Sequence, residues 1–183
     1  MIFPNGLWFD DGGLLYVTDS AAGAVFRITS NGVVSKWASD PLLVGGKDYC
    51  GVGKGVGVSF DIGANGIVRK GDAFYVTNTD KASIIRIPIA ADGSAGAATT
   101  FSGPSCDDLS GADGITLAPD GDFVVASNHL SELLRVDGKG VVSPILSGTP
   151  LDFPTSMVFQ NDALYVSNFA FLDSANPGLL RVK

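Results

Sequence analysis

Residues 112–128 read Ala-Asp-Gly-Ile-Thr-Leu-Ala-Pro-Asp-Gly-Asp-Phe-Val-Val-Ala-Ser-Asn. The Pro-Asp-Gly in the middle is a turn signal, and β-branched and apolar residues flank it as they do in strands. A third short apolar run, Leu133-Leu134-Arg135-Val136, follows after a few polar residues. The stretch therefore predicts three antiparallel strands joined by tight turns.

Three further copies of this unit occur in the chain. Each opens on a polar residue before an apolar strand, and its second strand ends in a hydroxyl residue and then Asp or Asn. The opening residues are 60, 48 and 42 positions apart, and a period of about 40 to 50 residues is typical of propeller blades with four strands. The repeats span approximately residues 5–40, 65–102, 113–148 and 155–183 and open at Asn5, Asn65, Asp113 and Thr155.

A fourth strand is expected in most of the units, at residues 33–38, 98–101 and 141–146, each after a turn that contains glycine. The last unit ends without one. Either Ile2 and Phe3 supply its missing partner strand, or an edge is left exposed. We therefore expect one all-β domain over residues 1–183. It is a β-propeller of about four blades, forming a closed small ring or an open arc of a larger, six-bladed propeller.

The composition of the chain limits the classes of partner that the protein is expected to bind. The 183 residues are 45% hydrophobic and include 24 Gly, which fits short buried strands and tight turns. A net charge of −7 and a pI near 4.4 argue against nucleic acid. No run is long enough to span a membrane, and no signal peptide is evident. We expect a small-molecule ligand, no nucleic-acid or membrane partner, and a homodimer if sheet edges are exposed.

The two cysteines lie in corresponding loops. Cys50 precedes the second repeat and Cys106 precedes the third, so a propeller places both on one face, one blade apart. This predicts a disulfide, and with it a secreted or periplasmic protein. Two free thiols in a cytoplasmic protein are the alternative.

The polar residues that open the repeats form the candidate site. In a propeller they converge on the mouth of the central channel, although their sequence positions are far apart. Amide and carboxylate oxygens are hard ligands that suit calcium or magnesium, and manganese or zinc less selectively. Asn and Asp before Gly are also common turn formers, which is the structural alternative for each residue alone. The members of this set are Asn5, Asn65, Asp113 and Thr155.

Other recurring residues are interpreted as scaffold. A third-strand Arg paired with a polar turn residue is expected to tie blades together, and tyrosines in the second strands to pack between sheets. His129, the single histidine, is expected in a solvated turn, away from a catalytic triad. The glycine-rich run at residues 51–57 lacks a phosphate-loop pattern and is assigned to a loop over residues 44–62 that could cover the channel mouth. The recurring residues are Arg27, Arg86, Arg135 and Arg181, then Asp19, Asn78, Asn128 and Asn168, and Tyr16, Tyr75 and Tyr165.

The chain resembles the gluconolactonase and regucalcin (senescence marker protein) family of six-bladed propellers. The residues that carry the likeness are Pro4-Asn5-Gly6-Leu7, Ala64-Asn65-Gly66-Ile67, Ala112-Asp113-Gly114-Ile115 and Pro154-Thr155-Ser156-Met157. Their order matches the third to sixth blades of that family.

The resemblance implies one divalent metal ion, calcium first with zinc, magnesium or manganese as alternatives. Asn65 and Asp113 correspond to metal ligands, and Asn5 to an accessory metal or substrate contact, with Thr155 as a further substrate contact. Asp113 would shuttle a proton from metal-bound water. The family's glutamate ligand has no counterpart, since the one glutamate in the chain is Glu132.

Two functions follow as expectations. The first is metal-dependent hydrolysis of a sugar lactone or a related cyclic ester, which would make the protein a hydrolase. The alternative is a binding or structural propeller without catalysis, which lacks the family's N-terminal blades and its metal-ligand glutamate.

Overall fold

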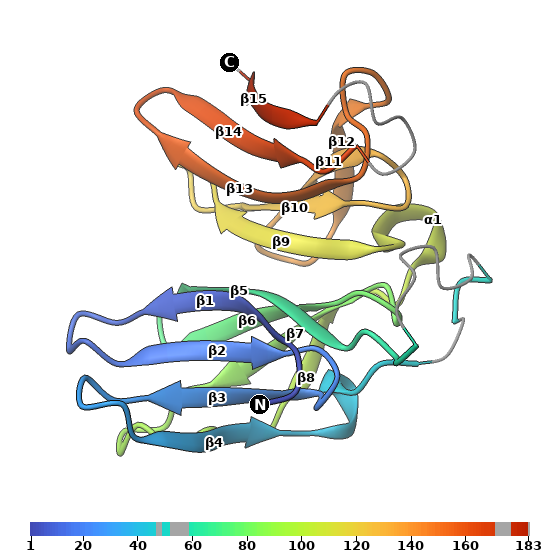
Figure 1. Ribbon diagram of the computed structural model, residues 1–183. Coiled ribbons are helices and arrows are strands. Elements are labelled where there is room, and N and C mark those ends of the chain that lie inside the picture. The colour runs from blue at the N-terminus through green and yellow to red at the C-terminus, as the bar shows by residue number, and fades with distance from the viewer. Residues whose placement is uncertain (47–48, 52–58, 171–176, 183) are drawn as a thin grey trace.

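The computed structural model describes residues 1–46, 49–51, 59–170 and 177–182. Four antiparallel sheets stand as blades around one axis, so the chain is an all-β propeller of four blades (Figure 1). In the described residues, no helix is long and apolar enough to cross a membrane.

Each blade is a meander whose strands follow one another outward from the axis. The first two blades are β1 (Pro4–Phe9), β2 (Leu15–Asp19), β3 (Ala24–Ile28) and β4 (Val34–Ser39), then β5 (Ala64–Lys70), β6 (Ala73–Asn78), β7 (Ser83–Pro88) and β8 (Thr99–Ser102). The last two are β9 (Ala112–Leu117), β10 (Phe123–Ser127), β11 (Glu132–Val136) and β12 (Val142–Ser147), then β13 (Pro154–Gln160), β14 (Ala163–Asn168) and β15 (Gly178–Val182). A short 3-10 helix (Pro41–Leu43) and α1 (Cys106–Leu109) lie between blades.

The hydrophobic core lies between blades, in three separate layers. Tyr16 of the first blade packs on Phe74 of the second, with ring centroids 4.6 Å apart, and Tyr75 packs on Phe123 of the third at 4.5 Å. Met157 and Val166 belong to the layer between the third and fourth blades. The packing role that was predicted for Tyr16 and Tyr75 is therefore confirmed.

Glycines in the inner strands set the spacing of the blades. A Cβ added at Gly6 would lie 2.4 Å from the carbonyl oxygen of Asn65 in the next blade. The same construction at Gly66 and at Gly114 meets the carbonyl oxygens of Asp113 at 2.4 Å and Thr155 at 2.6 Å. Glycine at this position therefore lets each inner strand approach the backbone of the next.

The seam between the fourth and first blades differs from the three packed interfaces. Ser156 takes the place of the glycine there and is exposed. The inner strands β1, β5, β9 and β13 adjoin one another in that order, whereas β13 and β1 make no comparable contact.

The expectation that Ile2 and Phe3 might pair with the last sheet is wrong. In the part of the chain that the structure describes, the last sheet has three strands, β13, β14 and β15, and the amides of Ile2 and Phe3 donate hydrogen bonds to the carboxylate of Asp19 instead. The carboxylate thereby ties the start of the chain to the end of β2.

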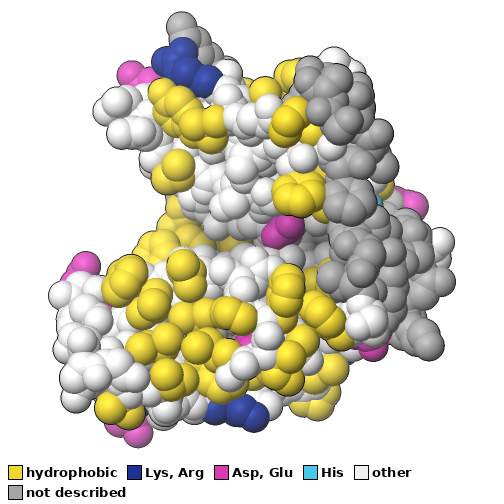
Figure 2. Space-filling view, in the orientation of Figure 1, with side chains coloured by type: hydrophobic (Ala, Val, Ile, Leu, Met, Phe, Trp, Pro, Cys, Tyr) yellow, Lys and Arg dark blue, Asp and Glu magenta, His cyan; other side chains and the backbone are white. Residues whose placement is uncertain are grey.

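One face of the first sheet remains apolar and open to solvent. Leu7, Phe9 and Val34 on this face are 61%, 66% and 48% exposed. Figure 2 shows apolar side chains spread over this blade, below the indentation that separates it from the last blades. The corresponding face of the second sheet, which includes Phe74 and Val76, is buried against the first blade.

A disulfide joins Cys50 to Cys106, with their Cα atoms 5.4 Å apart, as predicted. It fastens the loop before the second blade to the start of α1. Of the glycine-rich run in that loop, residues 52–58 lie outside the described part of the chain.

The prediction that arginines tie blades together is wrong in its connectivity. Arg86 of β7 pairs with Asp72 at 3.1 Å, and Asp72 lies in the β5–β6 turn of the same blade. Arg135 of β11 likewise contacts Asp120 and Asp122, in the β9–β10 turn of its own blade. These two arginines therefore each brace the turn between the first two strands of their own sheet, because the third strand runs beside that turn.

The polar residues at the ends of the second strands hold the upper loops, which are the loops that lead into the inner strand of each blade. This confirms a scaffold role for most of these residues. Asn78 donates to the carbonyl oxygens of Leu42 and Val44, and Asn168 to that of Pro150. Asn128 is the exception and is described with the site.

Candidate functional site

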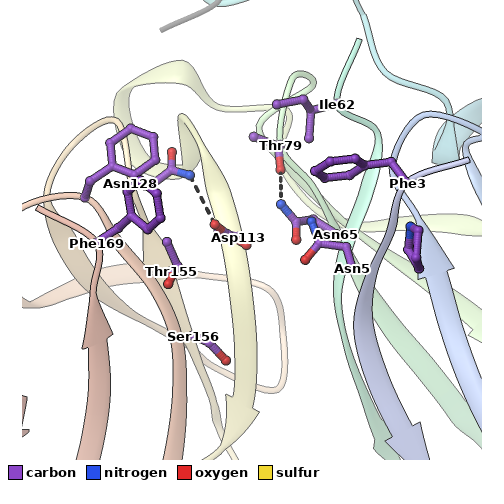
Figure 3. Close-up of a pocket in the computed structure, with 12 residues that line it drawn as sticks. Phe3, Asn5, Ile62, Asn65, Thr79, Asp113, Asn128, Thr155, Ser156 and Phe169 are labelled. Carbon is purple, nitrogen blue, oxygen red and sulfur yellow. Dashed lines mark hydrogen bonds between the residues drawn. The ribbon is translucent and has the colours of Figure 1, made fainter. Parts of the chain in front are cut away.

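A cavity of about 500 Å³ opens on the propeller axis. All four blades contribute to its wall, and Figure 3 shows the side chains that face it. All four residues that the sequence singled out line it, so the structure brings together positions that are far apart in the chain. The lining residues are Phe3, Pro4, Asn5, Ile62, Asn65, Thr79, Asp113, Asn128, Phe153, Thr155, Ser156 and Phe169.

A β-bulge in each inner strand turns the polar residue toward the axis. The pairing of β1 with β2 shifts register between Pro4 and Leu7, which brackets Asn5. Equivalent shifts bracket Asn65 in β5 and Thr155 in β13, and β9 has one around Asp113. Bulges commonly re-aim a side chain next to a functional site.

A hydroxyl group in the second strand accepts a hydrogen bond from the bulge in three of the blades, and in the first two it also donates to the next blade. Thr77 accepts a hydrogen bond from the amide of Gly66 at 2.8 Å and donates to the carbonyl oxygen of Asp113 in the next blade. Thr18 makes the same pair of contacts, with the amide of Gly6 and the carbonyl oxygen of Asn65. The recurring Thr of the second strand therefore links neighbouring inner strands.

A second hydroxyl orients the amide of each asparagine in the first two blades. Asn65 Nδ2 donates to Thr79 Oγ1 at 2.8 Å, and Asn5 Nδ2 donates to Ser20 Oγ at 3.1 Å. Since a hydroxyl holds each amide nitrogen, the amide oxygen is the atom left for a ligand. Figure 3 shows both asparagines on the wall opposite Asp113.

Asp113 is the one carboxylate among the lining residues of the described chain. Its Oδ2 accepts a hydrogen bond from Asn128 Nδ2 at 3.2 Å. Burial raises the pKa of Asp113 to about 7, against the side chains of Asn128 and Asn65, which favour the carboxylate. The carboxyl group can therefore exchange a proton near neutral pH.

Two residues that line the cavity have a buried amide oxygen that accepts no hydrogen bond: Asn65 Oδ1, and Asn128 Oδ1, which lies against Gly111. Buried polar atoms are nearly always satisfied, so an orphaned oxygen in a cavity marks a place for a ligand. Two amide oxygens and a carboxylate, Asn5, Asn65 and Asp113, form a donor set that fits a hard divalent cation. Within the described residues, no cluster of three His, Cys, Asp or Glu side chains exists, so amides would have to supply the remaining ligands.

The fourth blade contributes a hydroxyl in place of an amide. Thr155 Oγ1 lies 2.8 Å from Ser167 Oγ, and Ser156 lines the cavity beside it. Thr155 thus has a hydroxyl at the axis, in reach of a ligand in the cavity.

Asn128 was predicted to be a scaffold residue, but it lines the cavity. Its counterparts bind the upper loops, whereas Gly111 lies so close to Asn128 that a Cβ there would be 2.1 Å from Asn128 Oδ1. The neighbouring sequence carries no signal for this difference, because Gly-Ala-Asn-Gly at residues 63–66 repeats the Gly-Ala-Asp-Gly of residues 111–114 and Asn78 of that blade still binds a loop. His129 is half-buried rather than solvated: it lies 3.4 Å from Ser110 Oγ, and burial lowers its pKa.

The fold and the axial cavity define a β-propeller with a polar site at the centre of its blades. The chain belongs to the SMP-30/Gluconolactonase/LRE-like family, whose sequence pattern matches residues 62–170, more than half of the chain. A sequence comparison with curated proteins finds no match.

Solved structures share this fold at low sequence identity. Virginiamycin B lyase from Staphylococcus aureus, in a complex with quinupristin, superposes with a TM-score of 0.66 at 19% identity, over 98% of this chain and 55% of its own. A gluconolactonase from Xanthomonas campestris gives 0.65 at 16%, over 90% and 54%. Nidogen, from its complex with laminin, gives 0.68 at 16%, over 97% and 63%. The chain thus spans little more than half the length of these structures.

Proposed function

We propose that the protein hydrolyses a lactone or a related cyclic ester with the help of a divalent cation. The observation that carries the proposal is the Asp113 carboxyl group, whose pKa is raised to about 7 beside the unsatisfied Oδ1 of Asn65 in the axial cavity. Membership of the SMP-30/Gluconolactonase/LRE-like family and the likeness to a gluconolactonase support it.

In this proposal Asn65, Asp113 and Asn5 hold the cation. A bound divalent cation supplies Lewis acidity, which polarises an ester carbonyl and lowers the pKa of water. Asp113 holds or releases a proton at its carboxyl oxygens, and Asn128 Nδ2 orients that group through its hydrogen bond. In this proposal Thr155 Oγ1, from the fourth blade beside that of Asp113, contacts the substrate.

The test is lactone hydrolysis at constant pH, measured with and without EDTA. We expect activity that calcium or another divalent ion restores, and a loss of at least about a hundredfold in Asp113→Asn. Asp92→Asn is the control, because Asp92 lies in an exposed turn where its carboxylate accepts from Ser94. Full activity in Asp113→Asn would contradict the proposal.

A non-catalytic binding propeller is the second candidate. The observation that favours it is that Asp113 stands as the one lining carboxylate of the described chain, with no glutamate beside it. Thermal unfolding and the hydrolysis assay together separate the two candidates: a cation bound only by the folded state raises stability by about 2.7 kcal/mol at a hundredfold excess over Kd, and the assay shows whether the site is catalytic. Stabilisation without any hydrolysis would favour binding alone.

The disulfide supports a further part of the proposal, namely that the protein works in an oxidising compartment outside the cytoplasm.

A further inference from the structure

The upper part of the axial cavity has a different character from its polar floor. Phe3 and Ile62 line one side of it, and Phe153 and Phe169 line the other. Figure 3 shows Phe3 and Ile62 across the opening from Phe169, and Ile62 lies above the level of Asn65.

Phe3 and Phe153 occupy equivalent positions near the mouth of the cavity. Phe3 and Phe153 each stand two residues before the polar residue of their inner strand, in the first and the last blade. The corresponding residues of the middle blades are Gly63 and Gly111. A Cβ at Gly63 would lie 2.2 Å from the carbonyl oxygen of Leu43, so a side chain has no room there.

Two of the aromatic rings keep surface available to a ligand. Phe3 is 41% exposed and Phe169 is 59% exposed, and each has a second ring behind it. The ring centroids are 4.9 Å apart for Phe3 and Phe60, and 6.4 Å apart for Phe153 and Phe169. Rings supported in this way present fixed apolar surface, whose burial by a ligand is favourable.

The charges of the cavity argue in the same direction. Among its described lining residues there is no Lys, Arg or His, and Asp113 is acidic. Apart from the proposed cation, which the ester group would occupy, a phosphate or carboxylate on the substituent would find no cationic partner among these residues, and the protein carries a net charge of −7.

We propose that the substrate is an uncharged cyclic ester with an apolar substituent, whose ester ring lies on the Asn65 and Asp113 floor and whose substituent lies between Phe3 and Phe169. A polyhydroxylated sugar lactone would place hydroxyl groups against these rings without hydrogen-bond partners. This proposal rests on the proposed function for the ester chemistry, and on the aromatic walls for the substituent.

The first experiment compares δ-decalactone, which carries a pentyl chain, with δ-valerolactone and glucono-δ-lactone. We expect kcat/KM for δ-decalactone to exceed that for the other two by at least about tenfold, since several methylene groups become buried. Phe169→Ala and Phe3→Ala should each reduce that preference by roughly threefold to tenfold, because kcat/KM falls more for δ-decalactone than for δ-valerolactone.

The control is Phe9→Ala. Phe9 is a phenylalanine of similar exposure, 66%, on the outer face of β1, where it does not line the cavity. This variant should keep the wild-type preference. Equal kcat/KM for δ-decalactone and δ-valerolactone in the wild-type protein would overturn the proposal and leave lactone hydrolysis standing.

A binding measurement separates this inference from the proposed function. Calorimetry with δ-decanolactam and δ-valerolactam, amide analogues of the two lactones, needs no turnover. We expect tighter binding of the pentyl compound by about tenfold or more, and a loss of that difference in Phe169→Ala but not in Phe9→Ala. If no lactone is hydrolysed and this difference is found, the aromatic walls are supported and the esterase chemistry fails. If the two lactams bind equally, the apolar substituent is ruled out.

Discussion

Replacing Asp113 by Asn should stabilise the metal-free protein at alkaline pH. The pKa of Asp113 is raised to about 7, compared with about 3.9 for Asp in an unfolded chain. The folded state therefore binds the proton more tightly than the unfolded state. The stability contributed by the protonated group is fully present below about pH 4 and is lost as the pH rises through 7.

The magnitude follows from that difference of about three pH units. At about 1.4 kcal/mol per unit the ionised carboxylate costs the fold about 4 kcal/mol at pH 8, and partial exposure to the cavity reduces this to roughly 2 to 4 kcal/mol. Asn is neutral at every pH, and its side-chain oxygen can still accept the hydrogen bond from Asn128. The gain of Asp113→Asn should therefore be roughly 2 to 4 kcal/mol at pH 8 and close to zero at pH 4.

Urea unfolding in EDTA, followed at pH 4, 6 and 8, measures this difference as a change in midpoint. Asp92→Asn serves as the control, because its exposed carboxylate has a lowered pKa through hydrogen bonds with Ser94 and its loss should not stabilise the protein. A gain of equal size at all three values of pH, or no gain at pH 8, would refute the account of Asp113. With added calcium the wild-type protein should be more stable than Asp113→Asn, since the Asp113 carboxylate then binds the cation.

Three further changes probe the blades. Thr79→Val removes the hydroxyl that accepts a hydrogen bond from Asn65, so it should lower the free energy of unfolding in urea by about 1 to 3 kcal/mol. It should also weaken cation binding in calorimetry, and an unchanged cation affinity would mean that the Asn65 amide needs no such support. Phe74→Ala should cost about 3 to 5 kcal/mol because the side chain is fully buried between blades, and Phe9→Ala on the open face much less; equal costs would contradict the assignment of the buried interface. Replacing both Cys50 and Cys106 by Ala should lower the free energy of unfolding by about 4 kcal/mol, which is the loop-entropy value for a separation of 56 residues. A change under about 1 kcal/mol in thermal unfolding would mean that the loop is held without the disulfide.

The sequence predicts the blades well because each repeat carries its own local signals. Turn residues, alternating strands and the polar residue at the start of β1, β5, β9 and β13 are encoded within about 40 residues, so no long-range information is needed to find them. The disulfide could also be predicted, since Cys50 and Cys106 occupy equivalent loops and the repeat itself brings them to one face.

Long-range partners were harder to predict. The destination of Asn128 depends on whether an upper loop or Asp113 lies beside it, and three otherwise similar repeats bind loops instead. The arginine pairs stayed within a blade because strand three lies next to the first turn, a geometric fact that residue type does not reveal. The aromatic lining of the cavity could not be predicted from residue type, because it depends on the equivalent positions that Phe3 and Phe153 hold in the first and last blades.

The central claim is that Asn5, Asn65 and Asp113 together hold one cation. The most direct measurement is an anomalous difference map from crystals of the protein grown with manganese or calcium. We expect a single peak in the axial cavity within about 2.1 to 2.6 Å of Asn65 Oδ1 and an Asp113 carboxylate oxygen, with Asn5 Oδ1 as a further ligand or one water away. A cation bound elsewhere on the protein, with Asn65 Oδ1 still unliganded, would contradict it.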